Sequence, residues 1–145
     1  MMPSARQSTV STTRQPRLLD RYRWSVPDRA IRAEGFYRNA LAATRDGRDY
    51  AAIRYDLRAL QADGSHEAAR QHLESLREKL APQVGSLIES GRVAFRAEDL
   101  EQALQLWRQA LLVSPGNERA AAYIGRAERQ LANLERVRSE PEEED

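Results

Sequence analysis

The side chains best suited to chemistry in this chain are two histidines, and their spacing predicts no shared site. His66 and His72 stand six positions apart, which places them on nearly opposite sides of a helix, so we expect that they do not ligate one metal ion together. The chain contains no cysteine, and this excludes thiolate metal sites, cysteine nucleophiles and disulfides. We therefore interpret both histidines as surface or packing residues.

The other familiar catalytic patterns are also missing from the sequence. Its seven glycines stand singly rather than in a phosphate-binding loop. The serines lie in the N-terminal stretch, at predicted helix starts and near Gly91, without a His or Asp partner that the pattern suggests. Acidic pairs such as Glu98-Asp99 are typical of a helix N-terminus, where carboxylates interact favourably with the helix dipole. We expect no enzyme, no cofactor and no bound metal.

The chain has 145 residues, which is enough for one domain with a buried core. Its formal net charge of +1 hides two oppositely charged ends. Residues 1–32 contain seven Arg and two Asp, whereas residues 139–145 contain five acidic residues and no basic one. Because polar ends have no apolar face to bury, we predict a flexible basic arm at 1–26 and a disordered acidic tail at 139–145.

The sequence also bears on the compartment. No apolar run reaches the roughly 18 residues that a transmembrane helix needs, and the start lacks the apolar stretch of a secretory signal. We therefore expect a cytoplasmic protein. Residues 1–17 are rich in Arg, Ser and Thr and contain no acid, which leaves two alternatives: the mitochondrial matrix if this is a targeting segment, and the bacterial envelope if the true start is missing.

The elements that must position these residues are all predicted to be helices. Apolar residues recur at steps of three and four, for example at Leu100, Leu104 and Trp107, and no window alternates as a strand does. Residues that interrupt helices, such as Gly and Pro, separate these periodic segments. Asp99 and Asn117 are suited to cap the helices that follow them. Short connections should make neighbouring helices antiparallel. We predict six helices, at 27–46, 49–62, 66–81, 83–96, 99–113 and 118–138.

A repeat with a period of 34 residues is visible in the second half of the chain. Shifted back by this period, Ala103 coincides with Ala69 and Trp107 with Leu73. The pattern resembles the tetratricopeptide repeat (TPR) family, most closely over residues 84–117. The positions that agree with the family there are Leu87, Gly91, Ala103, Trp107, Ala110 and Pro115.

The resemblance implies an all-α fold in which antiparallel helical hairpins stack as a short TPR-like solenoid over residues 27–138. Small residues at Gly91 and Ala103 would let two helix backbones approach, and Trp107 would fill the gap between hairpins. The helices at 27–46 and 118–138 would cap the two ends, as terminal repeats do.

Residues 50–83 match this pattern more loosely. Leu57 stands where the family has Gly, and Leu76 stands where it has Ala. Two alternatives therefore stay open. In one, the helix at 27–46 packs on the helix at 49–62; in the other, the chain forms an irregular helical bundle whose heptad-like spacing imitates a repeat.

The resemblance also implies a concave groove lined by the first helix of each hairpin. Guanidinium groups pair with carboxylates or phosphates in a bidentate fork, so the predicted ligand is an acidic segment of another protein. Lys79 is the only lysine, so solvated helix faces that use Arg in place of Lys are the alternative. The basic residues predicted to face the groove are Arg54, Arg58, Arg92, Arg96, Arg119, Arg126 and Arg129.

We accordingly expect a protein–protein interaction scaffold or adaptor of the TPR type. A structural subunit of a larger assembly and an Arg-rich nucleic-acid or polyanion binder are the alternatives. Nucleic acid is less favoured because the part of the chain between the two charged ends has nearly equal numbers of basic and acidic residues. The acidic tail at 139–145 would either fold back over the groove or only solubilise the C-terminus, and the second is favoured because exposed ion pairs contribute little.

Overall fold

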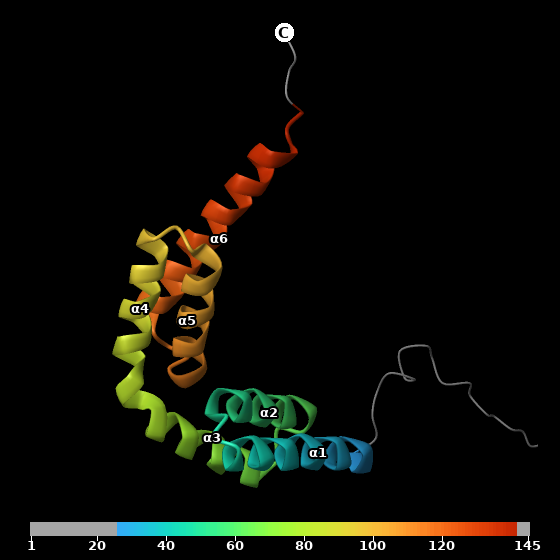
Figure 1. Ribbon diagram of the computed structural model, residues 1–145. Helices are drawn as coiled ribbons and strands as arrows, with labels where there is room; N and C mark the ends of the chain where they lie inside the picture. The colour runs from blue at the N-terminus through green and yellow to red at the C-terminus, as the bar shows by residue number, and fades with distance from the viewer. Residues whose placement is uncertain (1–25, 142–145) are drawn as a thin grey trace, which may run out of the picture.

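The computed structural model describes residues 26–141, and this part of the chain is all-α, with no strand (Figure 1). The predicted arm at 1–26 lies outside the described residues except for Val26, and the predicted tail lies outside them from residue 142 onward. The six predicted helices are confirmed to within one residue at each end. They are α1 (Val26–Arg45), α2 (Asp49–Ala62), α3 (Glu67–Leu80), α4 (Val84–Arg96), α5 (Leu100–Val113) and α6 (Glu118–Ser139), with a 3-10 turn, η2 (Ala81–Gln83), between α3 and α4.

Side-chain caps fix the starts of three helices. The predicted caps are confirmed: Asp99 Oδ1 accepts a hydrogen bond from Gln102 N at 3.1 Å, and Asn117 Oδ1 accepts one from Ala120 N at 3.0 Å. At α3 the cap is His66, whose Nδ1 accepts from the backbone N–H three residues later at 3.0 Å. Each bond satisfies a backbone donor that has no partner within its own helix.

The helices pack as two hairpins with one further helix each. Helix α1 packs most extensively on α2 and α4 on α5, while α3 packs on α2 and α6 on α5. The pairing of 27–46 with 49–62, which the sequence left open, is thus the one that forms. We call α1–α3 the first unit and α4–α6 the second unit.

The expectation that all neighbouring helices are antiparallel is wrong at α3 and α4, which follow one another along a single bent path (Figure 1). The physical reason lies in the backbone of η2. Leu80, Ala81, Gln83 and Val84 all keep right-handed helical dihedral angles, so no extended residue reverses the chain. The turn after α2 differs, because Asp63 is extended with φ −147° and ψ 102°.

The two units repeat with an offset of 51 residues. Fully buried alanines recur in pairs at this offset, such as Ala52 with Ala103 and Ala59 with Ala110. The hairpin turns also correspond, since Gly47 and Glu98 both have positive φ, at 74° and 64°. The hairpin equivalent to residues 84–117 is therefore 33–66, and the predicted register, which matched 84–117 to 50–83, is corrected.

The second unit continues the core of the first. Val113, at the end of α5, is buried in the apolar cluster of the first unit with Ile53 and Leu76. Arg77 Nε in α3 donates a hydrogen bond to the Leu112 carbonyl oxygen at 2.9 Å. Within residues 26–141, none of the helices combines the length and apolar character needed to cross a membrane.

Candidate binding site

A pocket opens in the second unit, where α4 and α6 flank α5. Its volume is about 250 Å³, which suits one side chain rather than a whole peptide. We call it the arginine–aromatic pocket. Its lining residues are Arg92, Phe95 and Arg96 from α4, Trp107 from α5, and Tyr123 and Arg126 from α6.

The floor of the pocket is a packed group of three aromatic rings. Trp107 is 1% exposed and stacks on Tyr123 with ring centroids 5.1 Å apart. Phe95 contacts the indole at 5.9 Å in a tilted arrangement. The indole N–H already has a hydrogen-bond acceptor, because Trp107 Nε1 donates to the Ile88 carbonyl oxygen at 3.1 Å. The faces of Trp107 are therefore covered by protein.

Gly91 explains how the indole reaches this position. It is buried in α4, and a Cβ on it would lie 2.7 Å from Trp107 Cδ1, which is closer than carbon atoms approach. Only glycine lets the indole lie against the α4 backbone here. The sequence predicted Gly91 as a position of close helix approach and placed Trp107 in the gap between hairpins; the direct contact between the two residues is a finding of the structure.

Three guanidinium groups lie at the rim of the pocket, and they differ in whether an acidic residue pairs with them. Arg92 forms an ion pair with Glu89 at 3.1 Å and lies 6.0 Å from the Tyr123 ring. The hydrogen bond with Glu89 raises the pKa of the Arg92 guanidinium. Arg96 and Arg126 are exposed and form no hydrogen bond or ion pair with any residue that the structure describes. Two guanidinium groups are thus available to a ligand.

The seven predicted groove arginines do not lie together: five belong to the second unit and two to the first. Arg92, Arg96 and Arg126 line the arginine–aromatic pocket. Arg119 and Arg129 lie on the same helix as Arg126, and Arg119 is 3.7 Å from Glu89.

The other two predicted arginines lie in the first unit. Arg54 and Arg58 line a separate pocket of about 170 Å³ along α2, together with Arg48, Ala51 and Tyr55. The seven arginines therefore do not line one common pocket.

The equivalent place in the first unit holds a polar network instead of aromatic rings. Asp56 corresponds to Trp107 and His72 to Tyr123. Asp56 is fully buried, and its Oδ2 is hydrogen-bonded to His72 Nδ1 at 2.6 Å. The other ring nitrogen, Nε2, lies 3.1 Å from Thr44 Oγ1. The network joins α1, α2 and α3.

Burial controls the charge of this network. It raises the pKa of Asp56 to about 6, against the opposing charge and hydrogen bond of His72. Asp56 Oδ1 is buried and has no hydrogen-bond partner among the described residues. An unpaired buried oxygen disfavours the ionised carboxylate.

The order Asp56–His72–Thr44 is that of a catalytic triad, but the surroundings do not support nucleophilic catalysis. Thr44 Oγ1 donates to the Ala40 carbonyl oxygen of its own helix at 3.1 Å. The neighbouring backbone N–H groups lie inside α1 and are used in helical hydrogen bonds, so they cannot stabilise an oxyanion. The network is structural. Its members come from three helices, so no local sequence pattern identified it.

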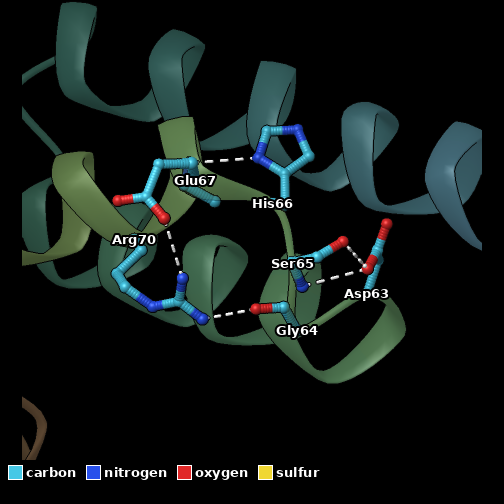
Figure 2. Close-up of polar contacts among 7 residues, drawn as sticks. Asp63, Gly64, Ser65, His66, Glu67 and Arg70 are labelled. Carbon is cyan, nitrogen blue, oxygen red and sulfur yellow. Dashed lines mark hydrogen bonds and ion pairs between the residues drawn. The ribbon is translucent and has the colours of Figure 1, made fainter.

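His66 also has a role that the sequence did not identify. Besides capping α3, its Nε2 lies 2.7 Å from Glu34 Oε2 in α1, and this contact lowers the pKa of Glu34. Figure 2 shows the turn around it, where Asp63 Oδ1 accepts from Ser65 and Arg70 contacts Glu67 and the Gly64 carbonyl oxygen. In the part of the chain that the structure describes, no group of three or more His, Asp or Glu is placed to hold a metal ion.

Neither the comparison with protein-family models nor the comparison with curated proteins finds a match for this chain.

Proposed function

We propose that this chain is a short helical-repeat scaffold of the TPR type that binds an acidic segment of another protein. The segment would place an acidic side chain in the arginine–aromatic pocket and continue along Arg119 and Arg129 of α6. In this proposal the chain assembles proteins and does not catalyse a reaction.

One observation carries the proposal: the arginine–aromatic pocket is a specialised feature of the second unit. The first unit packs its helices in the same order, α1 on α2 and α2 on α3, but Leu41 and Ser75 stand where the second unit has Arg92 and Arg126. The pocket is therefore not a by-product of the helical packing. Paired guanidinium groups above a desolvated aromatic floor are typical of sites that bind carboxylates.

One polar contact of α6 supports the proposal that this helix caps a repeat array. In the first unit, Arg77 contacts the following unit through the Leu112 carbonyl oxygen. Its equivalent in the second unit is Glu128, which instead forms an ion pair with Arg108 at 3.0 Å. Terminal repeats need such a polar outer face because no further repeat covers it.

A binding titration tests the proposal. A fluorescently labelled peptide rich in Glu should bind the wild type, and Arg96→Glu or Arg126→Glu should weaken its affinity at least about tenfold. Arg45→Glu is a matched control for the first variant, because Arg45 occupies the equivalent position in α1. Arg136→Glu is the control for the second on α6. The proposal fails if the pocket variants and the controls bind equally well.

A second candidate, polyanion binding, is favoured by the pocket on α2. Arg48, Arg54 and Arg58 gather there with Tyr55, and such a surface is suited to a phosphate backbone and a stacked base. Arg54→Glu with Arg58→Glu should then abolish binding of a single-stranded RNA while leaving acidic-peptide binding intact. RNA binding that both substitutions leave unchanged would exclude this surface.

A further inference from the structure

The arginine–aromatic pocket presents hydrogen-bond donors almost exclusively. Its charged groups are the guanidinium groups of Arg92, Arg96 and Arg126, and guanidinium groups only donate. A ligand that fills this pocket must therefore offer acceptor atoms and negative charge.

The charge of the pocket exceeds that of one carboxylate. Arg92 is partly neutralised by Glu89, while Arg96 and Arg126 have no anionic partner among residues 26–141. Two guanidinium charges from opposite walls therefore face a space of about 250 Å³, which admits one side chain. A single Asp or Glu supplies one negative charge, whereas a phosphorylated Ser or Thr supplies about 1.5 to 2 at neutral pH.

The aromatic floor does not provide a surface for a nucleobase. Base recognition requires an open ring face on which the base stacks. Trp107 has Tyr123 on one side and Phe95 against it, and it is 1% exposed. The Arg92 guanidinium lies over the Tyr123 ring, 6.0 Å from the ring centroid. These contacts favour an anionic side chain over a nucleotide.

We propose that the arginine–aromatic pocket binds a phosphorylated Ser or Thr side chain of a partner protein, and that Arg96 and Arg126 donate hydrogen bonds to the phosphate oxygens. This inference rests on the proposed function, since the phosphorylated residue lies within the acidic segment that the scaffold binds. The bidentate geometry of guanidinium groups matches the tetrahedral oxygens of a phosphate.

The test compares three peptides that differ at one position, which holds phosphoserine, Glu or Ser, by fluorescence anisotropy with the full chain. At pH 7.5 the phosphopeptide should bind at least about tenfold more tightly than the Glu peptide. At pH 5 this advantage should shrink, because the second pKa of a phosphomonoester is about 6. The Glu peptide, measured at both pH values, corrects for any general effect of pH on the protein.

Variants and a competitor locate the phosphate. Arg96→Ala and Arg126→Ala should remove the preference for phosphoserine over Glu, while Arg45→Ala and Arg136→Ala should preserve it. A short oligothymidylate, whose phosphodiesters carry one charge each, should compete less well than the phosphopeptide.

Three outcomes overturn the inference. If the Glu peptide binds as tightly as the phosphopeptide, the phosphate inference fails and the proposed function stands. If no peptide binds, both fail. If the oligothymidylate displaces the phosphopeptide at an equal concentration of phosphate groups, the site recognises nucleic-acid phosphate rather than a modified side chain.

Discussion

Asp56 in α2 and Trp107 in α5 occupy the same place in the two units, 51 residues apart, and each is almost completely buried at 0% and 1% exposure. One is a carboxylate bound to His72, and the other is an indole stacked on Tyr123. The equivalent buried position therefore belongs to an ionisable network in the first unit and to an aromatic group in the second. Only the first should respond strongly to pH.

Asp56→Asn should change how the stability of the protein depends on pH. The pKa of Asp56 is about 6 in the folded protein, above its ordinary value of 3.8, so the folded state holds this proton more tightly than the unfolded state. The contribution of Asp56 to stability is thus complete below about pH 4 and is lost as the pH rises through 6. Asn does not titrate, so the variant should gain stability relative to the wild type over this range.

Urea denaturation at pH 4 to 8 measures this difference. Glu34→Gln serves as the control, because the pKa of Glu34 is lowered and its contribution is lost as the pH falls. A constant difference in unfolding free energy between wild type and Asp56→Asn across this range would contradict the prediction.

Trp107→Ala should destabilise the protein by about 3–5 kcal/mol, because it removes the largest fully buried side chain among the described residues and leaves a cavity between α4, α5 and α6. Chemical denaturation followed by far-UV circular dichroism gives this value. Trp107→Phe should cost less, since a ring still fills part of the space. An unfolding midpoint unchanged by Trp107→Ala would show that the indole does not stabilise the packing of α4, α5 and α6.

Gly91→Ala should also be strongly destabilising, since its Cβ would overlap the indole of Trp107. Gly35→Ala is the matched control in α1, where a Cβ would meet nothing within 4 Å. At this exposed helical position Ala is favoured over Gly by roughly 0.5–1 kcal/mol, so the control should raise the melting temperature. Equal melting temperatures for the two variants would refute the close contact.

Glu89→Gln should strengthen binding of an acidic peptide. Glu89 lies 3.1 Å from Arg92 and 3.7 Å from Arg119, so its carboxylate competes with the ligand for both guanidinium groups. Because exposed ion pairs are weak in water, the gain in affinity should be about two- to fivefold. Glu74→Gln removes the same charge from α3 and should change the affinity little. An unchanged affinity in Glu89→Gln would show that Glu89 does not restrain the pocket.

The local features of the fold were predictable, and the long-range ones were not. Helix boundaries followed from breakers and from caps such as Asp99 and Asn117, because these depend on neighbours in sequence. The small residue at Gly91 and the large one at Trp107 were recognised from their spacing, but their direct contact was not. The offset of 51 was missed because a backbone that stays helical from Leu80 to Val84 adds an extra helix between the equivalent hairpins, and this depends on dihedral angles rather than on residue type.

The candidate site was predictable only in part. The basic residues of α4 and α6 were identified by the resemblance, but Arg54 and Arg58 were assigned to the same groove because the hairpin was taken as α2 with α3. The contact between Asp56 and His72 has no recognisable sequence pattern, because the two residues lie sixteen positions apart on different helices. Contacts of this kind arise from tertiary packing, which periodicity does not encode.

The most direct test of the central claim is to observe the arginine side chains themselves during ligand binding. Two-dimensional NMR of the Arg Nε–H groups, assigned by single Arg→Lys variants, would be recorded while a Glu-rich or phosphorylated peptide is added. The account predicts that Arg96 and Arg126 shift first and saturate together, with the indole N–H of Trp107 following. Shifts confined to Arg48, Arg54 and Arg58, or no shift at saturating peptide, would contradict it.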